Sequence, residues 1–200
     1  MTTVIRAARQ SDADEIALAH IEGWRVGYRH LLPAEFLDAP EFAAERRDRW
    51  RAWTWPQFAT TGEVFVAEID ERVVGFGHCG PERLQPECDQ AGTDQATRFS
   101  DVRGEVYGFY LHPDAWGSGA AAPLMQRCSR FLAERGFAHA VLWVLRDNPR
   151  ARSFYAKAGW APTGREILFM GPQTAQALPT PLPEVEYEIR LPVGNTSTDG

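Results

Sequence analysis

Two glycines in the second half of the chain mark the position best suited to bind an anion. Gly117 and Gly119 flank Ser118, and Ala120 and Ala121 begin the helical pattern that follows. Such a turn leaves several backbone N–H groups without partners at a helix start, where the positive end of the helix dipole also lies. Because these groups favour a phosphate or pyrophosphate, we predict a phosphate-binding loop at this position.

Three kinds of glycine turn compete for this position. A P-loop is excluded because no Gly-Lys-Ser/Thr follows the glycines. A dinucleotide-binding turn stays open, because Gly117, Gly119 and Ala122 satisfy the G-x-G-x-x-G/A spacing and Asp147 ends the next predicted strand. Against it, Gly117 does not follow its strand directly, and too little chain remains to complete a doubly wound sheet. A tight turn without any ligand is the third interpretation.

The elements around the turn are predicted from residue patterns. Residues 105–111 alternate aromatic and β-branched side chains as strands do, and Pro113, which has no N–H to donate, ends that strand. Apolar residues at helical spacing from Leu124 to Leu132 predict an amphipathic helix after the turn. Residues 138–145 are typical of a buried strand. The turn therefore lies between a strand and a helix.

The rest of the chain supplies the other elements of one mixed α/β domain, which we place at residues 1–193, with a disordered tail at residues 194–200. The polar stretch at residues 80–103 is long for a loop, so we expect it to be a lid or a mobile insertion. The remaining predicted elements are strands at residues 4–6, 63–68, 73–79, 166–170 and 185–191, a helix that begins at residues 11–14, and a helical region from Pro33 to Trp53.

Composition narrows the class of protein. The chain has 200 residues, of which 44% are hydrophobic and 24% charged, which is ordinary for one globular domain. Its net charge of −6 does not favour nucleic acid or an anionic membrane as partner. Three cysteines without C-x-x-C spacing argue against a disulfide framework or a zinc site. With neither a signal peptide nor an apolar run of about 20 residues visible, we expect a cytoplasmic protein without a metal.

A second motif follows the predicted strand at residues 138–145. Asn148-Pro149 is typical of a helix start, with asparagine as the cap and proline in the first helical position. The residues Asn148, Ala151, Phe154, Tyr155 and Gly159 then repeat a known family pattern. Together with the glycine turn, this motif resembles the GCN5-related N-acetyltransferase (GNAT) family, whose members move an acetyl group from acetyl-CoA to an amine.

The glycine turn departs from this family in one residue. The family's pyrophosphate loop reads Arg or Gln, x, x, Gly, x, Gly or Ala. Gly119 and Ala121 match it, whereas Trp116 stands where Arg or Gln is usual. The loop acts through its backbone N–H groups more than through that side chain, so the departure is tolerable.

The resemblance implies a fold and a position for the cofactor. The family fold is a mixed central sheet, splayed between its fourth and fifth strands, with helices on both faces. Pantetheine would lie in the splay, between residues 105–111 and residues 138–145. The cofactor contacts implied in this way are Phe109, Tyr110 and Leu111, the loop amides Trp116, Gly117, Ser118, Gly119, Ala120 and Ala121, and the pair Asn148 and Tyr155.

The resemblance also assigns the chemistry. A substrate ammonium must lose a proton before it attacks the thioester, and Glu105 stands where many family members carry this general base. Tyr155 matches the tyrosine that often protonates the thiolate. A backbone N–H near Tyr110 or Leu111 would stabilise the charge on the thioester oxygen. We interpret His78, His112 and His139 as structural and Cys128 as a core residue, so transfer would be direct, in a ternary complex.

The acceptor is left open by the sequence. By family analogy its pocket is formed by Trp24, Tyr28, Tyr107, Phe109 and residues 171–184, and it would take a small-molecule amine or a peptide amine. A homodimer is plausible by the same analogy. Two alternative functions remain: an NAD-type dinucleotide-binding oxidoreductase, and a non-catalytic module that binds acyl-CoA for regulation.

Overall fold

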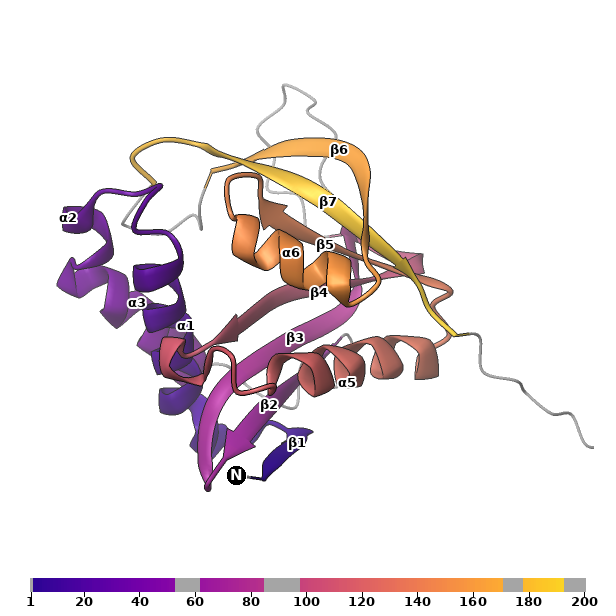
Figure 1. Ribbon diagram of the computed structural model, residues 1–200, viewed down its shortest axis with the longest axis horizontal. Coiled ribbons are helices and arrows are strands. Elements are labelled where there is room, and N and C mark those ends of the chain that lie inside the picture. The colour runs from indigo at the N-terminus through magenta and orange to yellow at the C-terminus, as the bar shows by residue number, and fades with distance from the viewer. Residues whose placement is uncertain (1, 53–61, 85–97, 171–177, 193–200) are drawn as a thin grey trace, which may run out of the picture.

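One seven-stranded sheet runs through the chain (Figure 1). The structure is a computed structural model that describes residues 2–52, 62–84, 98–170 and 178–192. The strands lie in the order β1-β2-β3-β4-β5-β7-β6, and all neighbouring pairs are antiparallel except β4 and β5, which are parallel. Their bounds are β1 (Thr3–Ala7), β2 (Glu63–Ile69), β3 (Arg72–Leu84), β4 (Arg98–Leu111), β5 (His139–Leu145), β6 (Ala161–Phe169) and β7 (Leu182–Arg190).

Helices pack on both faces of this sheet, because its strands are apolar on both (Figure 1). Along β2, Val64 and Val66 join the cluster of α1 to α3, while Phe65 and Ala67 join the cluster of α5 and α6. The helices are α1 (Ala13–Gly27), α2 (Ala34–Leu37), α3 (Pro40–Ala52), α5 (Ala121–Glu134) and α6 (Pro149–Lys157), with the short 3-10 turns η1 (Gln10–Asp12) and η2 (Pro113–Ala115).

Strands β4 and β5 separate towards their carboxyl ends. Their pairing begins at Arg103 with His139 and ends at Val106 with Leu142. Beyond that point β4 stays paired with β3 as far as Leu111, and β5 stays paired with β7. The backbone edge of β4 that faces β5 therefore has no partner strand after Val106. This confirms the predicted mixed sheet, splayed between its fourth and fifth strands.

The polar stretch at residues 80–103 is not the separate insertion that the sequence suggested. Strand β3 extends to Leu84 and β4 begins at Arg98, so both ends of the stretch belong to the sheet. Ion pairs between the two strands hold these polar ends together, and alternation of apolar residues could not reveal them. Residues 85–97 lie outside the described residues.

Other boundaries also differ from the prediction. The helical region from Pro33 is two helices, α2 and α3, because Pro40 begins a second one. Trp53 and the predicted tail at residues 194–200 lie outside the described residues. Within the described ranges, no helix combines the length and apolar character needed to span a membrane.

Candidate active site

A cavity of about 1890 Å³ lies where β4 and β5 separate. Helices α1, α3 and α6 and strands β3 to β7 all contribute to its wall. It therefore brings together most of the residues that the sequence singled out. Those that line it are Trp24, Tyr28, Glu105, Tyr107, Phe109, Tyr110, Leu111, Trp116, Gly117, Gly119, Ala121, Asn148 and Tyr155, whereas Ser118 and Ala120 do not.

The glycine turn presents unpaired N–H groups at the start of α5. Gly117 has φ = 82° and Gly119 has φ = 89°, a conformation that glycine adopts without strain. The amides of Ser118 and Ala120 are used inside the turn. Such a helix start can hold an anion without any side chain. The N–H groups that find no acceptor among the described residues are those of Gly117, Gly119, Ala121 and Ala122.

Trp116 and Arg150 form a stacked pair beside this turn. The Trp116 indole N–H donates to the carbonyl oxygen of Leu111 at 3.1 Å, which fixes the ring at the end of β4. The Arg150 guanidinium lies over that ring, 3.4 Å from its centroid. Both residues line the cavity. An arginine side chain from α6 thus stands next to the loop in which the family's own arginine is missing.

Helix α6 brings Asn148 and Tyr155 to the cavity. The Asn148 side-chain oxygen accepts a hydrogen bond from the Ala151 N–H at 3.1 Å, so asparagine caps α6 as predicted. Tyr155 lies about two helical turns after Asn148, towards the end of α6, and is buried. Burial is the main cause that raises the pKa of Tyr155, and the nearby Tyr110 and Glu184 raise it further. Its hydroxyl is therefore protonated at neutral pH.

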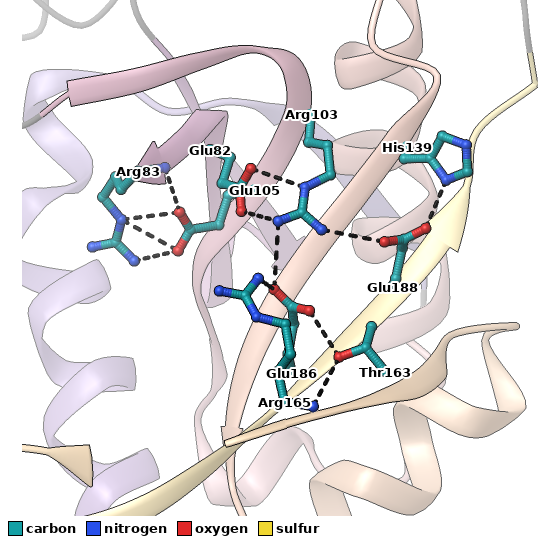
Figure 2. Close-up of polar contacts among 9 residues, drawn as sticks. All are labelled: Glu82, Arg83, Arg103, Glu105, His139, Thr163, Arg165, Glu186 and Glu188. Atoms are coloured by element: carbon teal, nitrogen blue, oxygen red, sulfur yellow. Dashed lines mark hydrogen bonds and ion pairs between the residues drawn. The ribbon is translucent and has the colours of Figure 1, made fainter. Parts of the chain in front are cut away.

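Glu105 is held by Arg83 (Figure 2). It lies within β4, is only 1% exposed and does not open the strand as the sequence suggested. The Arg83 backbone N–H donates to its Oε2 at 2.8 Å, and the Arg83 Nε approaches both oxygens at 3.2 Å. Both carboxylate oxygens are thus occupied by donors of one residue.

A separate network of ion pairs lies beside the Arg83–Glu105 pair (Figure 2). Arg103 of β4 contacts Glu82 on one side and Glu186 and Glu188 of β7 on the other. Glu186 is fully buried; it accepts from Arg165 at 2.7 Å and from the Thr163 hydroxyl at 2.8 Å. The network connects β3, β4, β6 and β7 beneath the cavity, so it fixes the strands that carry the site.

We expect Glu186→Ala to destabilise the fold. The change leaves Thr163 and part of the Arg165 and Arg103 charges without their buried acceptor, so the free energy of unfolding should fall by about 3 kcal/mol. Urea denaturation measures this loss. Glu188→Ala is the matched control on the same strand, because Glu188 is partly exposed and its removal should cost less than about 1 kcal/mol. Equal losses in the two variants would contradict a special role for Glu186.

Glu184 is a second carboxylate of the site, and it has no such partner. It lies on β7 and lines the cavity, and its side chain makes no hydrogen bond or ion pair within the described ranges. Burial, assisted by the charge of Glu105 and opposed by Arg83, raises its pKa to about 7. Burial is the main cause that raises the pKa of three cavity tyrosines, and the charge of Glu184 raises each of them further; they are Tyr28 just after α1, Tyr110 on β4 and Tyr155 on α6. Glu184 therefore faces the interior of the cavity.

We expect Glu184→Gln to be more stable than the wild type above pH 7. The folded state raises the pKa of Glu184 from 4.5 to about 7, so between these values it binds more protons than the unfolded state does. Wild-type stability therefore falls as pH rises through this window, and glutamine removes the effect. Melting temperatures at pH 4 and pH 8 measure it: the two proteins should agree at pH 4 and differ at pH 8. A lower melting temperature of the variant at pH 8 would contradict the unpaired state of Glu184.

The aromatic side of the cavity is formed by α1, α3 and β4. The rings of Trp24 and Tyr28 lie 4.8 Å apart, and Tyr107 donates its hydroxyl hydrogen to the carbonyl oxygen of Pro81. The Arg83 guanidinium lies 4.6 Å from the centre of the Tyr107 ring. These rings give the cavity a wall that is both apolar and rich in hydroxyl groups.

The three histidines singled out by the sequence are held in structural contacts or are weak bases. Burial is the main cause that lowers the pKa of His78 to about 3, with a contribution from Arg83, so His78 is a weak proton acceptor. His139 bonds to Glu188 at 2.7 Å, and His112 accepts from the Asp114 N–H; neither belongs to the cavity wall. Cys128 is fully buried in the core, as predicted. Among the described residues no cluster of side chains is suited to hold a metal ion.

Comparisons with known proteins agree with this geometry. The sequence model described as "Acetyltransferase (GNAT) family" matches residues 27–160, more than half of the chain. The chain belongs to the GNAT family of acetyltransferases. The uncharacterized N-acetyltransferase YuaI of Bacillus subtilis is 31% identical over 147 residues, which cover 72% of this chain and 73% of YuaI. This GNAT chain is therefore an acetyltransferase enzyme.

Solved structures show the same fold at low identity. The PaiA N-acetyltransferase from Thermoplasma acidophilum, in complex with coenzyme A, aligns with a TM-score of 0.67 at 15% identity, over 95% of this chain and 99% of that one. The yncA protein from Salmonella typhimurium, with its cofactor acetyl-CoA, gives 0.63 at 16% identity, over 96% and 95%. The sheet of this GNAT chain is mostly antiparallel, so the doubly wound parallel sheet of a dinucleotide-binding oxidoreductase is ruled out.

Sequence reasoning missed several residues of the GNAT site. Arg83 and Arg46 lay in a supposed insertion and in a helix that showed no motif, and Arg150 looked like an ordinary residue of α6. Glu184 is the last residue of the segment 171–184 that the family analogy assigned to the acceptor pocket, but its carboxylate received no role from the sequence. A signal existed, because Glu184, Glu186 and Glu188 alternate with apolar residues and so lie on one face of β7.

Proposed function

We propose that this protein transfers the acetyl group of acetyl-CoA to the primary amine of a small molecule or peptide, by direct attack in a ternary complex. One observation carries the proposal: the opening between β4 and β5 connects a turn with four unpaired N–H groups to a buried tyrosine hydroxyl and an unpaired carboxylate. Anion-binding amides, a protonated donor and a proton acceptor in one cavity are the groups that this reaction needs.

The donor would bind along β4. The amides of Gly117, Gly119 and Ala121, next to Arg150, suit the pyrophosphate of coenzyme A. Pantetheine would then follow the free edge of β4 at residues 109–111, with Asn148 on its other side. The same edge offers the N–H of Tyr110 or Leu111 to the thioester oxygen, where negative charge develops during attack. Two structural neighbours bind coenzyme A or acetyl-CoA, which supports this assignment.

The proton of the acceptor would go to Glu184. An alkylammonium group has a pKa near ~10.4, so a base must take its proton before the nitrogen can attack. Glu105, the base implied by the family resemblance, has both oxygens engaged by Arg83. Glu184 is unpaired within the described ranges, and its pKa of about 7 suits a general base at neutral pH. We therefore propose Glu184 as the base and Glu105 as the residue that positions Arg83.

The leaving thiolate would be protonated by Tyr155. This residue lines the cavity from α6, opposite the strand that would hold the thioester. Its raised pKa keeps the hydroxyl protonated, so it can donate to sulfur as the carbon–sulfur bond breaks. The N–C bond forms as the C–S bond breaks, and nitrogen loses two protons in all. The first goes from the ammonium to Glu184 before attack and from there to solvent. The second leaves as the amide forms and replaces, through solvent, the proton that Tyr155 gives to sulfur.

Thermal unfolding with added nucleotides tests the cofactor assignment. A ligand that binds only the native state raises the melting temperature by mass action. We expect acetyl-CoA and coenzyme A each to raise it, and NAD(H) to leave it unchanged. Stabilisation by NAD(H) alone would overturn the proposal and make the glycine turn a dinucleotide site.

A further inference from the structure

Arg46 of α3 is a buried cation that has no anionic partner among the residues that the structure describes. Its side chain is 5% exposed and lines the cavity. Its Nη1 donates to the carbonyl oxygen of Phe42 at 3.0 Å, but its Nε is buried without any hydrogen-bond partner among the described residues. No carboxylate of the described ranges forms an ion pair with it. Burying a guanidinium in this way is costly unless something offsets the charge.

Aromatic rings supply part of that compensation. The Arg46 guanidinium lies 3.4 Å from the centre of the Phe42 ring and 4.6 Å from that of Trp24. The indole N–H of Trp24 is a second buried donor of the cavity wall; it makes no hydrogen bond of normal length among the described residues, although it acts on the pKa of the nearby Tyr110 hydroxyl. The Nε of Arg46 is thus the donor that these neighbours leave without an acceptor. The aromatic rings lie over the face of the guanidinium and stabilise its charge. They cannot accept hydrogen bonds from its N–H groups, which point outward in the plane of the guanidinium.

Arg49 adds a second positive charge near Arg46 and also lines the cavity. Burial is the main cause that lowers the pKa of Arg46 to about 10, with Tyr110 opposing and Arg49 contributing to the shift. Glu45 lies beside them on α3 but does not reach Arg46. The two arginines also act on His20, whose pKa is lowered first by burial and then by their charges, so His20 stays neutral. This end of the cavity therefore attracts an anion.

A carboxylate without an ion-pair partner among the described residues, Glu184, lines the same cavity. Burial is the main cause that raises the pKa of Tyr28 and Tyr110, and Glu184 raises both further; the same two tyrosines also act on the pKa of Arg46. The two phenols, which also line the cavity, are thus neighbours of both charged groups. A molecule that contacts both charged groups meets an acceptor for its amine proton and a cation.

We propose that Arg46 binds the carboxylate of the acceptor, so that the acceptor is an amino acid or a small molecule that carries a carboxylate close to its amine. This inference rests on the proposed function and names its substrate class. An ammonium directed at Glu184 and a carboxylate directed at Arg46 match the two charged side chains of the cavity that have no ion-pair partner among the described residues. A planar carboxylate can accept two hydrogen bonds from the guanidinium fork, which an amide or alcohol cannot replace.

Matched acceptor pairs test the proposal in the wild-type enzyme. The standard L-amino acids, their carboxamides and aminoalkyl phosphonates are offered with acetyl-CoA, and the rate of free thiol release is measured. For at least one side chain, we expect the acid to be preferred over its amide by roughly 100-fold in kcat/KM. Acetylation of amides and acids at equal rates overturns the anion site and leaves the proposed function standing. Preference for the phosphonates overturns the carboxylate assignment.

Two variants assign any preference to Arg46. In Arg46→Met we expect KM for the acid to rise by roughly 100-fold, with KM for the amide and the affinity for coenzyme A unchanged. Arg46→Lys keeps the charge without the fork and should retain part of the preference. Equal losses for acid and amide in Arg46→Met would mean that Arg46 serves only the packing of Phe42 and Trp24, and would overturn the proposal.

A binding measurement at equilibrium tests the anion site without depending on catalysis. Calorimetric titration of each acid and amide into wild-type enzyme saturated with coenzyme A should give heat for the acid only, and Arg46→Met should abolish it. Absence of thiol release with every amine, together with such binding, would reject the acetyl transfer while keeping the anion site. Equal binding of the acid by both proteins would reject the anion site.

Discussion

Glu184→Gln is expected to lower kcat/KM for amine acetylation by roughly 100-fold at pH 8. Glutamine has nearly the same shape as glutamate but cannot accept a proton, so the ammonium must lose its proton to water. The wild-type rate should rise with pH with a midpoint of about 7, the pKa of Glu184 in the cavity, and the variant should lack this step. The measurement is kcat/KM against pH, by thiol release.

The groups around Glu184 determine the pKa at which its carboxylate titrates. Burial raises its pKa most; Glu105 on β4 raises it further, and Arg83 on β3 lowers it. The three tyrosines around it, Tyr28, Tyr110 and Tyr155, stay protonated through this range because their own pKa values are raised. The buried His78 and His20 titrate well below pH 7, so a step near 7 that Glu184→Gln removes is assigned to the carboxylate.

Glu166→Gln is the matched control for Glu184→Gln. Glu166 lies on the neighbouring β6, is about half exposed, pairs with Arg146 and does not line the cavity. It should leave the pH profile unchanged. If Glu184→Gln also retained the wild-type profile, Glu184 would not be the base.

Tyr155→Phe is expected to lower kcat by roughly 100-fold and leave KM for acetyl-CoA nearly unchanged. The change removes the hydroxyl that protonates the leaving thiolate but keeps the buried ring. An acyl donor with a better leaving group, such as an acetyl ester of a thiophenol derivative of low pKa, should recover much of the loss, because its thiolate needs no proton. Steady-state kinetics with both donors measures the effect.

Tyr187→Phe separates this role from packing. Tyr187 is as buried as Tyr155, lies 6.3 Å from it between ring centres and hydrogen-bonds to Arg152, but it does not line the cavity. It should lose a little stability and no catalytic rate. Equal kcat in Tyr155→Phe and wild type would exclude Tyr155 as the proton donor.

The local motifs could be predicted from the sequence because their geometry is local. Proline and asparagine at residues 148–149 fix the start of α6 within a few residues, and Gly117 and Gly119 permit the positive φ of the turn. The splay between β4 and β5 came from the family resemblance, and the short register from Arg103 to Val106 confirms it.

The charge balance of the cavity could not be predicted in this way. Glu105 looked like a free strand-end carboxylate because its partner, Arg83, is distant in sequence and lay in a supposed insertion. Glu184 and Arg46 differ from other charged residues because neither has an ion-pair partner among the described residues. Such an absence can be recognised only in the three-dimensional structure. Long-range pairing across the sheet thus decides which carboxylate is free to act as a base.

Direct acetyl transfer is tested most simply by following the acetyl group itself. The enzyme is incubated with isotope-labelled acetyl-CoA, first without and then with an acceptor amine, and protein and small molecules are analysed by mass spectrometry. We expect no label on the protein in either sample, and one labelled acetyl per released thiol on the amine. Label on the protein before the acceptor is added, or thiol release without an acetylated amine, would contradict transfer in a ternary complex.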